Sequence, residues 1–147
     1  MQTSVHPAAA PSLPAPPRDL GREMFVADLQ AELAGIEARH MSNVAAARAR
    51  IAAGESPFAV HRHKILGGHS TALRLQALVL NLYNGGEWRK KVPAPLDDLI
   101  ANADRSHFEA ALDLLRGYYD RREEDREFLA LGRQLAEERQ PRARRAA

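Results

Sequence analysis

Apolar positions along residues 19–53 recur at spacings of three and four, which is the pattern of one long amphipathic α-helix. Eight positions share this face: Val26, Leu29, Leu33, Ile36, His40, Val44, Ala47 and Ile51. A helix of this length extends over roughly 50 Å at the α-helical rise. Its face is also long enough to pair in a coiled coil, although the later positions are mostly alanine and make a thin interface. We expect packing against the chain's own helical domain. A homodimer through this helix stays open, as does a break near Gly35 or around Met41-Ser42-Asn43.

The pattern changes after residues 54–57, whose sequence Gly-Glu-Ser-Pro is typical of a helix end and a turn. Residues 54–69 have no helical periodicity and are predicted to form a loop. Residues 70–84, STALRLQALVLNLYN, then form a helix that is apolar around most of its circumference. Such a helix predicts the buried centre of a domain. Gly85 and Gly86 follow its last apolar turn, where glycine commonly ends a helix.

The rest of the chain predicts a basic loop, GEWRKKVP, and helices over about residues 95–101, 106–119 and 121–139. Ser106 and Glu109 match a capping box, with serine at the N-cap and glutamate three residues later. The apolar positions that follow at helical spacing are expected to face inward: Phe108, Ala111, Leu112, Leu115, Tyr119, Phe128, Leu131, Leu135 and Ala136. The sequence therefore predicts an all-α fold, a small helical bundle of four or five helices over residues 18–139.

The two ends differ from this domain in composition. Residues 1–17 contain five prolines and few large apolar side chains, so we expect a disordered arm. Residues 140–147, QPRARRAA, form a basic tail. The first seventeen residues lack the basic start of a secretory signal, and no stretch of eighteen apolar residues could span a membrane. The chain has no cysteine, which excludes thiolate chemistry and fits a reducing compartment. We expect a cytoplasmic protein.

Charge is distributed unevenly along the chain, although the net charge is only +2. Residues 61–100 hold six basic and three acidic side chains, whereas residues 101–138 hold six basic and ten acidic ones. Residues 139–147 hold four arginines and no acid. A segmented pattern of this kind suggests contact with a partner.

The stretch HRHKILGGHST, residues 61–71, carries the most candidate chemistry. Three histidines at positions 61, 63 and 69 suggest a zinc site, yet no acid lies between Glu55 and Glu87 to orient a ligand or act as a base. Gly67 to Thr71 have the small residues of a phosphate loop but neither its glycine spacing nor its lysine, which leaves only anion binding at the helix start. We predict no metal, no cofactor and no catalytic residues, and hence no enzyme.

Three basic clusters remain as candidate contacts with a protein or a nucleic acid. They comprise His61, Arg62, His63 and Lys64; Trp88, Arg89, Lys90 and Lys91; and Arg142, Arg144 and Arg145. The first two flank the central helix, so they are expected near its opposite ends. Because a long helix, a proline-rich arm and a basic tail all serve contact, we predict a non-enzymatic protein that binds a protein partner. A nucleic-acid-binding regulator that uses the basic loops and the tail is the alternative.

Two segments, GGHSTALRLQALVLNLYNGGEW and APLDDLIANADRSHFEAALDLLRGYY, show a resemblance to a known group of proteins. Over about residues 67–119 the chain resembles small helical proteins of unknown function from proteobacterial conjugative elements, plasmids and prophages. The matching features are a small-residue helix start, a leucine-rich run to Tyr83-Asn84, Leu96 to Leu99, and Asp104. The resemblance implies an accessory role on a mobile element, such as anti-defence or regulation, and implies no catalytic residues.

Overall fold

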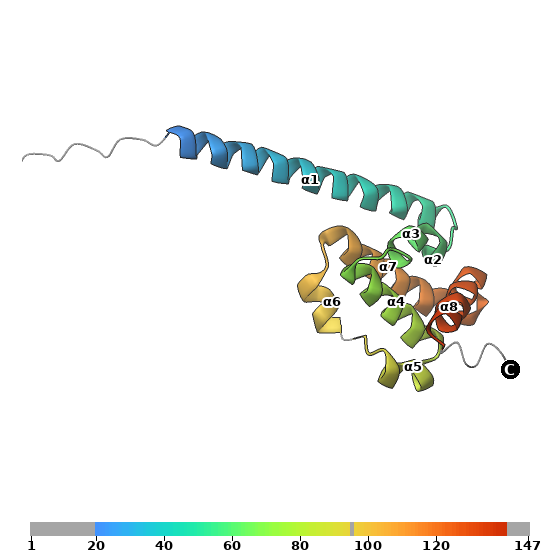
Figure 1. Ribbon diagram of the computed structural model, residues 1–147. Helices are drawn as coiled ribbons and strands as arrows, with labels where there is room; N and C mark the ends of the chain where they lie inside the picture. The colour runs from blue at the N-terminus through green and yellow to red at the C-terminus, as the bar shows by residue number, and fades with distance from the viewer. Residues whose placement is uncertain (1–19, 95, 141–147) are drawn as a thin grey trace, which may run out of the picture. The chain divides into compact units, whose positions relative to one another are not determined.

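The computed structural model describes residues 20–94 and 96–140, and this part of the chain is all-α (Figure 1). Its elements are α1 (Leu20–Ala52), α2 (Pro57–Val60), α3 (Arg62–Ile65), α4 (Ser70–Tyr83), α5 (Gly85–Lys91), α6 (Leu96–Asn102), α7 (Arg105–Arg121), η1 (Arg122–Glu124) and α8 (Arg126–Arg139). The predicted fold class is confirmed, but the described residues form more helices than the expected four or five. The proline-rich arm and residues 141–147 of the basic tail lie outside the described ranges.

The long helix α1 is unbroken, and the chain divides into two compact units between its Gly35 and Ile36. Residues 21–34 of the first unit are exposed. In the second unit Val44 and Ala47 are buried, and the Nη2 of Arg48 lies 2.6 Å from the Glu109 Oε2 of α7. The expected packing of this helix against the chain's own domain is therefore found for its C-terminal part.

Two segments predicted as loops contain short helices. Residues 54–69 hold α2, where the Ser56 Oγ accepts the Phe58 N–H and Pro57 occupies the first position, and α3. Residues 85–91 form α5, whose N-cap is Asn84. Gly85 and Gly86 therefore begin α5, and the prediction that they end α4 was wrong in this respect. Helices of four to seven residues show too few turns for a period to appear in the sequence.

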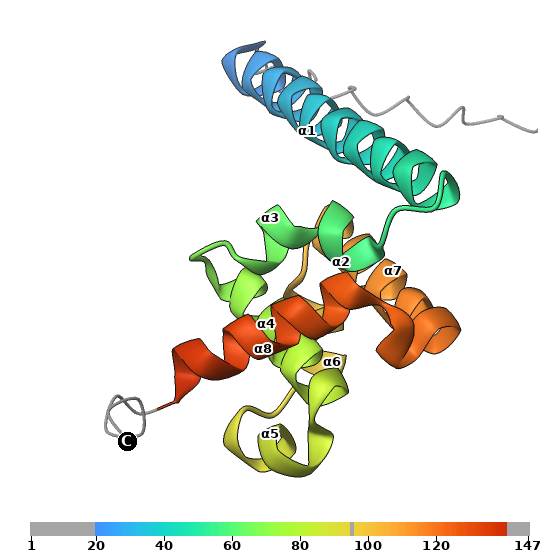
Figure 2. The same cartoon turned by 90° about the vertical axis from the view of Figure 1, so that its right-hand side faces the viewer.

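Helix α4 lies at the centre of the second unit, as predicted, with α3, α5, α6, α7 and α8 packed against it (Figures 1 and 2). Its buried residues are Ala72, Leu75, Ala77, Val79 and Leu80. The core also takes in the predicted Phe128, Leu131 and Leu135 of α8. Leu73 departs from the prediction because it is half exposed. None of the helices in the described ranges has the length and apolarity needed to cross a membrane.

The start and the inner face of α7 differ from the prediction. Asp104 caps this helix by accepting the His107 N–H at 3.0 Å, whereas Ser106 lies inside the helix and is buried. The buried apolar positions are Ala110, Ala111 and Leu114, while Tyr119 is 76% exposed. An aspartate two residues upstream moves the start of the helix, so the capping box predicted at Ser106 does not form.

Glycines allow two of the helix contacts in the second unit. A Cβ added to Gly117 of α7 would lie 2.6 Å from the Cγ of Pro57 in α2. A Cβ added to Gly132 of α8 would overlap the ring of Tyr83 at the end of α4. Asp125 completes this corner, because it caps α8 and accepts the hydroxyl of Ser56 at 2.6 Å. These contacts hold α2 and α8 close to their neighbours.

Candidate functional site

His61, predicted as a surface contact, is buried within the second unit. Its exposure is 2%, and its Nε2 lies 2.9 Å from the Oδ2 of Asp113, which is also buried. The pKa of His61 is lowered, chiefly by burial and also by Lys64 and His63, against the opposing effect of Asp113. The prediction of a surface contact was therefore wrong for His61, because α7 brings a carboxylate to it from 52 positions along the chain.

The neighbours of His61 also take part in contacts within the protein. Arg62 donates to the Oε1 of Gln134 in α8, and Lys64 donates to the Oγ and the backbone carbonyl of Ser106. Burial lowers the pKa of Lys64. His63 is exposed. The loop predicted over residues 54–69 thus contains two short helices. Of the three basic side chains beside His61, Arg62 and Lys64 are engaged in contacts between helices.

A hollow of about 290 Å³ gathers four histidines from separate elements. Its lining consists of His40, Asn43, His63, Lys64, His69, Asp104, Ser106 and His107. The Nδ1 of His69 accepts the Ala72 N–H and caps α4, and the Nδ1 of His107 lies 2.7 Å from the Asp104 carboxylate. Within the described ranges, no group of three or more His, Asp or Glu side chains is arranged to hold a metal ion. Of the four histidines, His69 and His107 are therefore already engaged in hydrogen bonds within the protein.

The second predicted cluster divides between the core and the surface. Trp88 is 3% exposed and belongs to the hydrophobic core, so it is not available to stack on a base. Lys91 pairs with Glu87 at 2.8 Å and lies over the Trp88 ring. Arg89 and Lys90 are exposed. As expected, α3 and α5 lie near opposite ends of α4 (Figures 1 and 2), so these clusters do not form one patch. Arg142, Arg144 and Arg145 lie outside the described residues.

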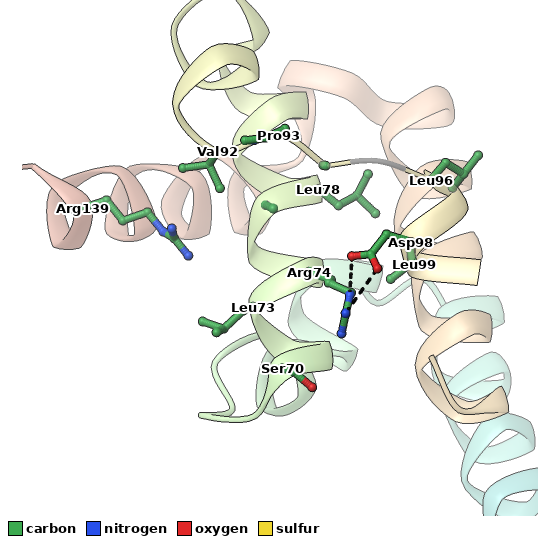
Figure 3. Close-up of a pocket in the computed structure, with 12 residues that line it drawn as sticks. Ser70, Leu73, Arg74, Leu78, Val92, Pro93, Leu96, Asp98, Leu99 and Arg139 are labelled. Atoms are coloured by element: carbon green, nitrogen blue, oxygen red, sulfur yellow. Dashed lines mark hydrogen bonds and ion pairs between the residues drawn. The ribbon is translucent and has the colours of Figure 1, made fainter. Parts of the chain in front are cut away.

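An apolar groove of about 350 Å³ crosses α4 and was not predicted from the sequence (Figure 3). The apolar lining residues are Leu73, Ala77, Leu78, Val92, Pro93, Ala94, Leu96 and Leu99. Arg139 extends toward α4 from α8 on one side, and α6 borders the other side (Figure 3). Leu73 and Leu96 are each about half exposed at 50% and 52%, so apolar surface continues onto the rim. The groove has the volume and the lining of a binding site.

The charged groups of the groove are held in place by hydrogen bonds. The Arg74 Nε donates to the Oδ2 of Asp98 at 2.7 Å, and this hydrogen bond lowers the pKa of Asp98 and keeps it ionised. The Nη2 of Arg139 donates to the Oε1 of Gln76 at 3.1 Å, and the Gln76 amide donates to the Ile65 carbonyl at 2.9 Å. Within the described ranges no carboxylate pairs with Arg139. The charged lining residues Arg74, Asp98 and Arg139 thus give the groove one positive charge in excess. The carboxylate among these lining residues is already paired with Arg74, so the groove suits binding and not acid–base chemistry.

A second candidate surface lies on the first unit. Phe25, Val26, Leu29 and Leu33 recur along one side of α1 and are 68%, 43%, 45% and 56% exposed; we call them the α1 apolar face. Single exposed apolar residues are ordinary, but a continuous row of large ones marks an interaction surface. Periodicity located Val26, Leu29 and Leu33 in the sequence, whereas Phe25 and the exposure of the face are findings of the structure.

The groove was missed because its parts are far apart in the sequence. Arg74 and Asp98 are separated by 24 positions, and Gln76 and Arg139 by 63. The only sequence signal was Arg74 itself, a charged residue within the most apolar helix.

Comparisons of the chain with protein-family models, with curated proteins and with solved structures gave no match.

Proposed function

We propose that this chain is a non-enzymatic interaction protein that binds a protein partner through the α1 apolar face. The observation that supports the proposal is the exposure of Phe25, Val26, Leu29 and Leu33, between 43% and 68%, on one side of a regular helix. Removing apolar surface from water favours association by about 25 cal/mol for each Å², and part of this offsets the freedom lost on binding. A helix that presents an apolar row is a common means of protein recognition, in which the row enters a groove on the partner.

The charges beside the face indicate the chemistry of the partner. Asp28 and Glu32 lie one turn apart along one margin of the row, and both are exposed. Acidic side chains at the rim favour a partner whose binding surface is apolar with basic residues at its edge. The accessory role on a mobile element belongs to this proposal and rests on the resemblance of residues 67–119.

Site-specific photo-crosslinking tests the proposal. A benzophenone amino acid replaces Phe25 on the face or Ala31 on the opposite side of the helix, and crosslinked proteins are identified after irradiation in cells. We expect a defined protein adduct from position 25 and none from position 31. The adduct should survive nuclease treatment and should be lost in the double variant Leu29→Glu, Leu33→Glu, while a matched Gln30→Glu variant retains it.

Equal crosslinking from both positions would contradict the proposal, because it would indicate contact without a preferred face. Loss of the adduct on nuclease treatment would favour the alternative, a nucleic-acid-binding regulator. That alternative predicts binding that weakens steeply with salt and on removal of Arg142, Arg144 and Arg145.

A further inference from the structure

We propose that the partner of the α1 apolar face is a second copy of this chain, and that the face binds in the apolar groove of that copy. The inference rests on the proposed function, since it names the partner for the same face. It is carried by the match between two surfaces of one chain, an exposed acidic-rimmed helix and an apolar groove with an excess positive charge.

The helix has the composition that the groove requires. Residues 21–35 include three acids and one arginine, and Asp28 and Glu32 border the row formed by Phe25, Leu29 and Leu33. At 100° per residue these two acids follow the same margin of the helix. An apolar row with carboxylates on one side therefore presents two or three large side chains and a negative edge together.

The groove has complementary features. Its volume of about 350 Å³ accommodates a few large side chains, and its half-exposed Leu73 and Leu96 extend the apolar surface beyond the hollow. Asp98 already neutralises Arg74, whereas Arg139 is held by the uncharged amide of Gln76. The unneutralised charge is thus at the α8 side of the groove, where it would attract a carboxylate of the helix.

Pairing of the α1 faces with each other in a coiled coil is less favourable. In a parallel coiled coil, Val26 and Leu33 would occupy the position named a in each heptad. This register places Glu32 of one copy beside Glu37 of the second copy, so that like charges meet. An antiparallel pair that aligns the apolar residues from Val26 to Ile36 places the two Glu32 side chains together. The seam is also short, because His40 and Asn43, which continue it, line the histidine hollow of the chain's own unit.

The test is the mixing of two full-length variants, each with one surface altered. The face variant carries Leu29→Glu and Leu33→Glu, and the groove variant carries Leu73→Glu and Leu96→Glu, all at positions at least 45% exposed. In sedimentation velocity the wild type should associate with rising concentration, and each variant alone should stay monomeric. Their equimolar mixture should form a one-to-one complex, because one intact face meets one intact groove. Circular dichroism of each variant serves as the control for folding.

Self-association of the groove variant alone would overturn the inference and indicate a coiled coil of α1. A monomeric wild type would also overturn it, while a face-dependent crosslink to a different protein would leave the proposed function in place. Arg139→Glu in the copy that supplies the groove should weaken the mixed complex about tenfold or more. Asp28→Arg with Glu32→Arg in the other copy should restore the affinity, whereas Gln30→Arg, at an uncharged position, should restore less.

Discussion

Burial and the neighbouring carboxylate act in opposite directions on the proton of His61. Removal of the imidazole from water disfavours its charged form, and Asp113 at 2.9 Å favours it. Burial is the largest single effect, and Lys64 and His63 act in the same direction, so the pKa of His61 in the folded protein is lower than its ordinary value of about 6.5. Among the residues that the structure describes, the buried Nδ1 of His61 has no hydrogen-bond partner and hence no acceptor for a second proton. A neutral His61 that donates from Nε2 to Asp113 is the arrangement that fits these contacts.

The stability of the protein should therefore fall as the pH is lowered through the range of histidine titration. Unfolded chains bind a proton at His61 near pH 6.5 and folded chains only at lower pH, so the contribution of His61 is complete above about pH 6.5 and is lost below it. The unfolding free energy from urea titration should decrease between pH 7.5 and 5.5, and His61→Gln should reduce this slope. The matched His63→Gln removes only the smallest of the effects that lower the pKa of His61, so it should reduce the slope less than His61→Gln does. An unaltered slope in His61→Gln would contradict the assignment.

Helix α8 can approach α4 closely because residue 132 has no side chain. The overlap of an added Cβ includes the Cβ of Tyr83 at 2.9 Å, so rotation of the tyrosine ring alone would not relieve it. We expect Gly132→Ala to lower the unfolding free energy by about 2 kcal/mol, as for an overpacked core, despite the better helix propensity of alanine. Gly68→Ala is the control, because open space surrounds that position and no positive φ is involved. If Gly132→Ala lowered the unfolding free energy no more than Gly68→Ala does, α8 would tolerate the added methyl group, and the prediction would be wrong.

At the scale of the whole molecule, the two units of the chain should differ in how they respond to the same substitution. Leu80 is fully buried in the second unit, and Leu33 is 56% exposed in the first. Leu80→Ala should lower the unfolding free energy by about 3 kcal/mol through lost burial and a cavity. Leu33→Ala should change it by less than about 0.5 kcal/mol, as expected for surface positions. Thermal and urea unfolding at low concentration provide the measurement, since self-association would couple binding to stability. A large loss in Leu33→Ala would contradict the division of the chain.

The sequence predicted the bounds of some helices well and misplaced those of others. The long helix was predicted to within one residue at each end, because periodicity over many turns averages out local exceptions. The start of α7 was misplaced, because Asp104 and Ser106 are both good caps. In the structure Asp104 accepts the His107 N–H, while Ser106 lies inside the helix and contacts Lys64. Tyr119 was expected inside on spacing alone, yet the packed side of α7 is the one that carries Ala110, Leu114 and Gly117.

The sequence by itself determined the all-α class, the extent of α1 and the burial of α4. These properties depend on the local period of apolar residues, which every stretch of chain carries within itself. Only the tertiary structure decided that His61 is a buried partner of Asp113, that Trp88 belongs to the core, and that a groove lies between α4, α6 and α8. Such features depend on which helix faces meet, and the pairs involved are separated by 24 to 63 positions, beyond the reach of any periodicity.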